Sequence, residues 1–161
     1  MARTPTTGTT PGPTLRVRLG DRLVVRLQNR LDTATYLHTH GLRVSPAGDA
    51  DNIFVTVAPG AEHTYTYEIP ADHRSGLFWY DPHVHGHVAE QVAGGLAGAI
   101  IIVDDIDTTD PITTSTERIW VLSDPPITSG IPTTAVSQMT RMQGREGHVV
   151  LVNGLAQPDL A

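Results

Sequence analysis

Two pairs of histidines, each with one residue between the two imidazoles, are the side chains best suited to chemistry in this chain. The first pair is His38 and His40, the second is His83 and His85, and a glycine follows each pair. Residues two apart in a strand point to the same face, with Cα atoms roughly 6–7 Å apart. Two imidazoles at that spacing can bind one metal ion or two neighbouring ions. The pattern predicts a metal site; the alternative is strand histidines satisfied by hydrogen bonds.

The residues around the two pairs favour strands as the elements that carry them. Thr, Tyr, Val, Phe and Trp flank the histidines, with Gly and Pro close by, and these β-branched and aromatic types are typical of strands. A helix would instead place its two histidines four positions apart, as in the zinc-protease motif. We therefore expect the two pairs to lie on two strands or strand ends that meet.

Composition excludes several classes of function. The chain has 161 residues, enough for one domain with its own core, and a formal net charge of −6 without any basic run, so a nucleic-acid-binding surface is not expected. There is no cysteine, which excludes disulfides, zinc–thiolate sites, thiol catalysis and a thiolate-ligated blue-copper site in this chain. The 15 glycines and 12 prolines favour short strands joined by tight turns.

The most apolar run is only as long as a buried strand. It covers residues 96–103, far short of the twenty or so residues that span a bilayer, so no membrane span is expected. The first seven residues contain no apolar core, so no export signal is expected at this end of the chain.

Alternation of apolar and polar residues, with turn residues between the runs, predicts an all-β chain. In residues 62–69 the alternation is strict, which predicts one buried face and one solvent-exposed face. His63, in this run, and His73, in the loop that follows, are expected to be surface or hydrogen-bonded histidines. With no long amphipathic helix, an antiparallel sandwich or barrel is the expected architecture. We expect strands at 14–19, 22–29, 37–44, 53–57, 62–69, 77–80, 96–103, 118–123 and 148–153, and a short helical turn at 87–92.

Four motifs together resemble the N-terminal cupredoxin domain of the multicopper oxidases, the family of laccases, copper efflux oxidases and spore-coat oxidases. They lie at residues 10–17, 37–42, 78–86 and 94–100. The resemblance implies a single all-β, cupredoxin-like Greek-key sandwich or barrel over residues 14–125. Residues 1–13 would then be a flexible lead-in, and residues 126–161 an extension that resembles the exit towards a second cupredoxin domain.

The resemblance also implies roles for the histidines. In this family, four His-x-His motifs hold a trinuclear copper cluster between the first and last domains, and the first domain supplies two of them. By this resemblance His38 matches the type-2 copper ligand, and His40 and His83 match type-3 ligands. Asp81 stands where the family has the remaining type-3 histidine. His85 is then expected beside the metal ligands, orienting one of them.

Asp81 is a departure whose meaning the residues leave open. A carboxylate is a harder, anionic ligand than imidazole, so copper binding could be altered or weakened, or lost altogether. The set His40, Asp81 and His83 is also a two-histidine, one-carboxylate combination that zinc or non-haem iron would accept.

The resemblance implies that this chain contributes half of the ligands of a copper site at which O2 is reduced. Because the chain has no cysteine for a type-1 copper, a complete oxidase is not expected from this chain alone. Its partner would be another cupredoxin domain, or further copies of itself in a dimer or trimer. The alternatives are a structural module that binds no metal and mediates assembly, and a mononuclear metal site formed by His and Asp ligands. Members of the family are often exported, so the localisation stays open.

Overall fold

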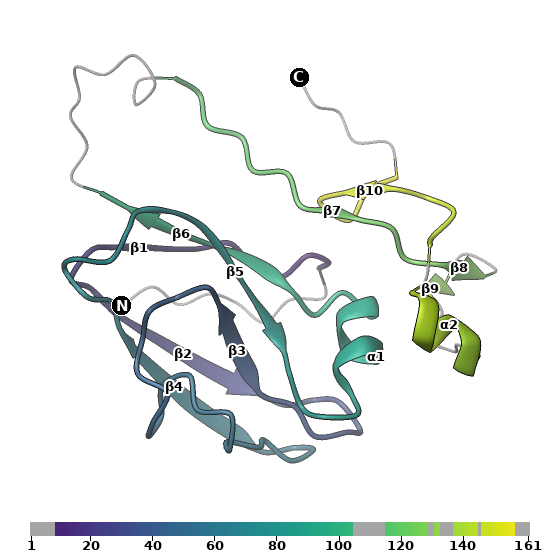
Figure 1. The fold of residues 1–161 in the computed structure, drawn as a ribbon, viewed down its shortest axis with the longest axis horizontal. Helices are drawn as coiled ribbons and strands as arrows, with labels where there is room; N and C mark the ends of the chain where they lie inside the picture. The colour runs from purple at the N-terminus through teal and green to yellow at the C-terminus, as the bar shows by residue number, and fades with distance from the viewer. Residues whose placement is uncertain (1–8, 105–114, 129–130, 133–136, 145, 157–161) are drawn as a thin grey trace.

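The computed structural model describes residues 9–104, 115–128, 131–132, 137–144 and 146–156. Residues 1–8 of the predicted lead-in and parts of the predicted extension lie outside these ranges. Strands dominate the described residues, and the two helices are short (Figure 1). The elements are β1 Leu15–Arg18, β2 Arg22–Gln28, β3 Leu37–His40, β4 Glu62–Glu68, β5 Gly76–Pro82, α1 Val88–Ala93, β6 Gly98–Val103, β7 Leu122–Ser123, β8 Ile127–Thr128, β9 Ile131–Pro132, α2 Gln138–Gln143 and β10 Leu151–Val152.

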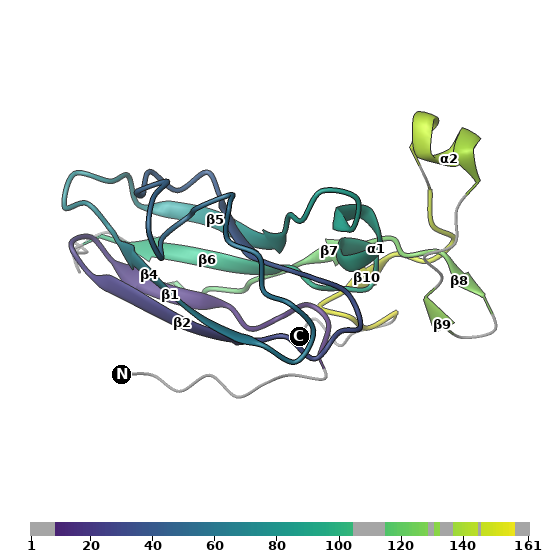
Figure 2. The ribbon, with the colours of Figure 1, turned by 90° about the horizontal axis from the view of Figure 1, so that it is seen from below.

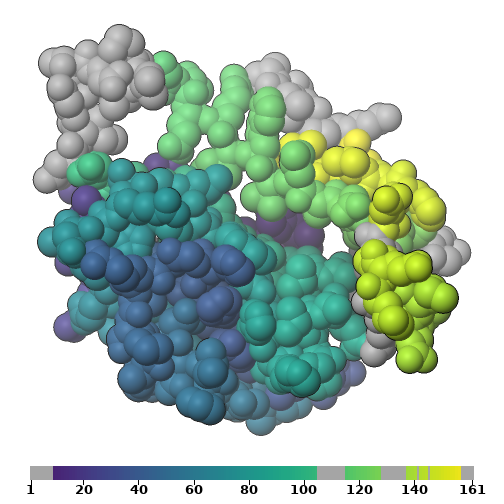
Figure 3. All heavy atoms as spheres, viewed as in Figure 1, coloured from purple at the N-terminus to yellow at the C-terminus, as the bar shows by residue number. Residues whose placement is uncertain are grey.

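Two layers of strands enclose the core. One layer is a four-stranded sheet in the order β1-β6-β5-β3, and the other is the antiparallel pair β2-β4. In Figure 2, β5 and β6 lie above β2. The inward side chains of both layers form one apolar cluster. The described C-terminal residues, coloured green to yellow in Figure 3, gather along one side of this sandwich. The prediction of an all-β sandwich is thus confirmed.

The alternating pattern of β4 has the predicted consequence. Tyr65 and Tyr67 point into the core with no exposed surface, whereas Glu62 and Glu68 face solvent. β6 lies between β1 and β5 and is buried along almost its whole length, as its continuous apolar sequence predicts. Each fully buried isoleucine of such a strand contributes about 1.5–3 kcal/mol to the free energy of unfolding.

Three predicted strands are shorter than expected by more than two residues. The strand predicted at 37–44 stops at His40, because Gly41 takes a φ of +88°, in the left-handed region that interrupts an extended chain. The strands predicted at 118–123 and 148–153 are reduced to the short antiparallel pair β7 and β10.

Two further predictions about strands were wrong. Residues 53–57 form no strand, and one isolated bridge joins Val57 to Thr35. The architecture is also not wholly antiparallel, because β1 runs parallel to β6. Because β2 belongs to the other sheet, the turn between β1 and β2 leads the chain from one layer into the other.

The segment that leads into β3 is held by two buried amide side chains. Asn29 donates hydrogen bonds to the carbonyls of Thr33 and Val57, both at 2.9 Å. Gln91, which α1 contributes, donates to the carbonyl of Ala34 at 2.8 Å. Because β3 carries His38 and His40, these amides fix the approach to the histidine strand.

The end of the N-terminal segment and one loop histidine are also tied down. Gly12 donates its N–H to the Ala97 carbonyl at 2.7 Å. His73 is buried; its Nε2 accepts the Arg43 N–H at 2.9 Å, and its Nδ1 donates to the Arg74 carbonyl at 2.8 Å. This histidine is hydrogen-bonded, as predicted. Among the described residues, no helix combines the length and apolarity needed to cross a bilayer.

Tyr65 should make the protein sensitive to alkaline pH. Its hydroxyl oxygen accepts the Leu37 N–H at 3.0 Å, and burial raises its pKa from 10.0 to about 12. Above pH 10 the unfolded state therefore loses this proton more readily than the folded state does, so stability falls as pH rises from 10 to 12. Between pH 9 and 11, wild type should lose about 1 kcal/mol more than Tyr65→Phe. Urea unfolding at each pH measures this, and equal losses in both proteins would contradict it.

Candidate metal centre

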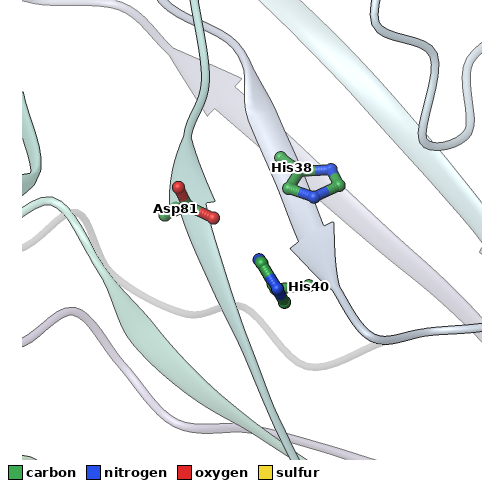
Figure 4. Close-up of side chains that lie close together, drawn as sticks. All are labelled: His38, His40 and Asp81. Atoms are coloured by element: carbon green, nitrogen blue, oxygen red, sulfur yellow. The ribbon is translucent and has the colours of Figure 1, made fainter. Parts of the chain in front are cut away.

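Pairing of β3 with β5 brings two histidines and a carboxylate together. His38 lies opposite Asp81 in the antiparallel register, and His40 lies opposite Trp79. Because alternate residues share a face, the side chains of His38, His40 and Asp81 all leave the sheet on the side away from the core. Figure 4 shows the three converging from the two strands. One candidate ligand atom from each lies within 4.8 Å of the other two.

Asp81 is buried without a partner for one of its oxygens. The residue is 3% exposed, and Oδ1 has no hydrogen-bond partner among the described residues. Burial raises the pKa of Asp81, and the neighbouring His38, His83 and His40 act in the opposite direction. A buried, unsatisfied carboxylate oxygen is costly unless something pairs with it. A cation between Asp81 and the two imidazoles would satisfy it.

Asp51 fixes the orientation of His38. Its Oδ1 lies 3.0 Å from His38 Nδ1 and also accepts the Thr39 N–H at 3.2 Å. With Nδ1 as the donor to this carboxylate, the lone pair for a metal is on Nε2 of His38. Asp51 lies between β3 and β4, outside every strand that the sequence predicts, and its contact with His38 was not predicted. A single acidic residue in a loop carries no local signal of such a role.

Trp79 supports the second histidine. The rings of His40 and Trp79 are stacked, with centroids 4.7 Å apart and planes inclined by 22°. Trp79 itself is 39% exposed. The indole therefore forms one wall beside His40 on the outer face of the sheet and limits how the imidazole can rotate.

The second predicted pair lies just beyond a strand end, within the prediction of strands or strand ends. β5 ends at Pro82, so His83 and His85 follow the strand and do not share its alternation. His83 is exposed, yet its ring centroid is only 5.2 Å from that of His38. His85 is also exposed, and within the described residues no hydrogen bond, ion pair or ring contact joins it to any of the four predicted ligands, which it was expected to orient.

Two imidazole nitrogens and one carboxylate oxygen form a donor set that transition metals accept. The exposed rings of His40 and His83 leave the outer side of this set open. The arrangement can hold a metal ion against the sheet while other ligands approach from outside.

Comparison with known proteins gives the family. Residues 4–107 match the sequence profile of the multicopper oxidases. The multicopper oxidase mco of Staphylococcus haemolyticus is 33% identical over 150 residues, which cover 92% of this chain and 32% of that protein. Laccase-4 of Thanatephorus cucumeris is 37% identical over 107 residues, covering 62% of this chain and 19% of that protein. The chain thus spans about a third or less of the curated relatives it matches.

Solved structures agree with this assignment. A multicopper oxidase from Campylobacter jejuni, described as a metallo-oxidase, matches with a TM-score of 0.81 and 35% identity, over 94% of this chain and 31% of that one. A multicopper oxidase from Pseudomonas thermotolerans matches with a TM-score of 0.76 and 29% identity, over 94% of this chain and 36% of that one. The predicted cupredoxin-like fold is confirmed, and copper is the metal that the family implies. The chain belongs to the multicopper oxidase family.

Proposed function

We propose that this chain is a copper-binding domain of a laccase-like oxidase and supplies half of the histidine ligands of a trinuclear copper site that reduces O2. His38 would be the type-2 ligand, and His40 and His83 type-3 ligands, with Asp81 in the remaining ligand position. The observation that carries the proposal is the convergence of His38, His40 and Asp81 around an unpartnered, buried carboxylate oxygen. Copper bound there would supply the one-electron steps by which O2 is reduced.

The residues of this chain would prepare the site for the metal. Asp51 holds the His38 ring with Nε2 free, and Trp79 restrains the His40 ring. Asp81 supplies an anionic oxygen opposite His38. His85, beyond the end of β5, contacts none of these ligands within the described residues, so no role in holding the metal is proposed for it.

The site needs a second contributor. His40 and His83 are exposed on the outer face, and the chain spans about a third of the multicopper oxidases whose structures it matches. A further cupredoxin domain would cover this face and bring the remaining ligands; self-association into a dimer or trimer is the other route. Without a cysteine in the chain, the thiolate of a type-1 copper must come from elsewhere. In this proposal residues 14–125 are the cupredoxin unit, and residues 126–161 lead to the next domain.

Copper titration of the purified chain, followed by calorimetry, tests the proposal. Wild type should take up Cu(II), and His38→Ala and His40→Ala should each weaken binding by at least about tenfold, because each removes a ligand. His148→Ala, which removes an exposed histidine of the C-terminal region, is the matched control and should bind as wild type does.

The other outcomes separate the alternatives. No uptake of any metal would leave a structural module, and tight binding of Zn(II) or Fe(II) with weak Cu(II) would favour a mononuclear site. Size-exclusion chromatography of the metal-free and copper-loaded chain tests self-association, which copper should promote if copies share the site.

A further inference from the structure

Asp81 differs from its histidine neighbours in charge as well as in chemistry. It lies in β5 directly opposite His38 and is 3% exposed. Its Oδ1 has no hydrogen-bond partner among the described residues. The carboxylate is therefore shielded from water, and an ion bound beside it would interact with its charge more strongly than with an exposed carboxylate.

We infer that Asp81 makes this site selective for copper in its divalent state, so that the chain by itself holds one Cu(II) ion through His38, His40 and Asp81. The inference rests on the proposed function, because it takes copper as the metal. It concerns the oxidation state that the site prefers, which the two histidines alone do not determine.

The charges around the site favour Cu(II) over Cu(I). Two carboxylates lie there, because Asp51 is hydrogen-bonded to the far side of the His38 ring. With neutral imidazoles, Cu(II) and the two carboxylates sum to zero, whereas Cu(I) leaves an excess negative charge. A histidine at position 81 would leave Cu(I) neutral and Cu(II) with an excess positive charge. Because excess charge at a partly buried site is unfavourable, Asp81 reverses the preference.

Ligand chemistry points in the same direction. A carboxylate oxygen is a hard donor, whereas Cu(I) prefers soft ligands. The two imidazoles of His38 and His40 suit either oxidation state, so the third donor decides between them. Because Asp81 sits within 4.8 Å of both candidate nitrogen atoms, it can act as this third donor without a change in the backbone.

Dissociation constants for Cu(II) and for Cu(I) in wild type, Asp81→Asn and Asp81→His test the inference. Each is measured at neutral pH by competition with a chelator of known affinity, and Cu(I) is handled without oxygen. Asp81→Asn keeps the shape and removes the charge, so it should weaken Cu(II) about a hundredfold and change Cu(I) by less than about threefold. This change in ratio corresponds to a reduction potential about 120 mV higher. Asp81→His should shift the ratio in the same direction.

A matched control and a fold check accompany these variants. Glu68→Gln removes one negative charge from the exposed face of the other sheet, where Glu68 pairs with Arg22, and it should leave both constants unchanged. Circular dichroism and thermal unfolding of each metal-free variant establish that it is folded. Asp81→Asn should fold at least as well as wild type, because it removes a buried, unpaired charge.

Two other results would separate a failure of the Cu(II) selectivity from a failure of the copper site itself. Equal weakening of Cu(II) and Cu(I) in Asp81→Asn, or no change in either, would overturn the selectivity while leaving the proposed copper site in place. If wild type and Asp81→His both fail to bind copper, the inference and the proposed function fall together.

Discussion

Asn29→Ala should lower the free energy of unfolding by about 4 kcal/mol. Asn29 is 2% exposed; its amide donates to the Thr33 and Val57 carbonyls, and its Oδ1 accepts the Leu31 N–H at 2.9 Å. Alanine removes all three bonds and leaves two carbonyls and one N–H without this partner. The Val57 carbonyl keeps the Thr35 N–H at 3.0 Å, so the Thr33 carbonyl and the Leu31 N–H are the groups left stranded, and each is expected to cost about 1–3 kcal/mol. Urea unfolding of the metal-free protein measures the loss.

Asn29→Asp separates the hydrogen bonds from the shape of the side chain. A carboxylate keeps the acceptor for the Leu31 N–H, but it turns an oxygen towards the two carbonyls of Thr33 and Val57. We therefore expect Asp to destabilise at least as much as Ala. Gln28→Ala, at the exposed end of β2, should change stability by less than about 1 kcal/mol. A loss below about 1 kcal/mol in both Asn29 variants would refute this account of the segment before β3.

Asp51→Ala should weaken Cu(II) binding by roughly tenfold to a hundredfold, although Asp51 is not a proposed ligand. Without its carboxylate, His38 loses the group that holds Nδ1 as the protonated nitrogen. The ring can then rotate or present the wrong tautomer. Copper binding must therefore also order the ring, and this cost lowers the affinity. Calorimetry measures the affinity.

A second readout separates positioning from simple loss of structure. Nitrogen-15 NMR of the histidine side chains should show the protonated Nδ1 of His38 in wild type and a mixture of tautomers in Asp51→Ala. Asp51→Asn keeps an oxygen acceptor for His38 and Thr39 but removes the charge, so its affinity should lie between the two. Asp49→Ala changes a more exposed acid of the same loop, 3.6 Å from His63, and should leave the affinity unchanged. Unchanged tautomers and affinity in Asp51→Ala would rule out the positioning role.

The sequence predicts best those features that depend on residues close together in the chain. Alternation over residues 62–69 places Tyr65 and Tyr67 in the core, and the spacing of His38 and His40 places both rings on one face of β3. The short helical turn near residue 90 is present as α1. Each of these follows from backbone periodicity alone.

Features that depend on pairing between distant segments are not visible in the sequence. Asp81 lies opposite His38 only because of the register between β3 and β5, and no local pattern fixes that register. Asp51 reaches His38 from a loop, and Trp79 stacks on His40 from the neighbouring strand. The resemblance to a known family supplies candidate ligands, but it cannot supply the effect of Asp81, where this chain departs from the family pattern.

The parallel pairing of β1 with β6 sets the order in which the protein can be completed during translation. β1 is synthesised first among the strands of the four-stranded sheet, and β6, its neighbour among the described strands, is synthesised last. A nascent chain that stops before Gly98 therefore leaves β1 without its neighbour and exposes one edge of β5. Such unpaired edges are prone to association between chains. Synthesis through Val103 is the point at which the sheet that carries the histidines can close.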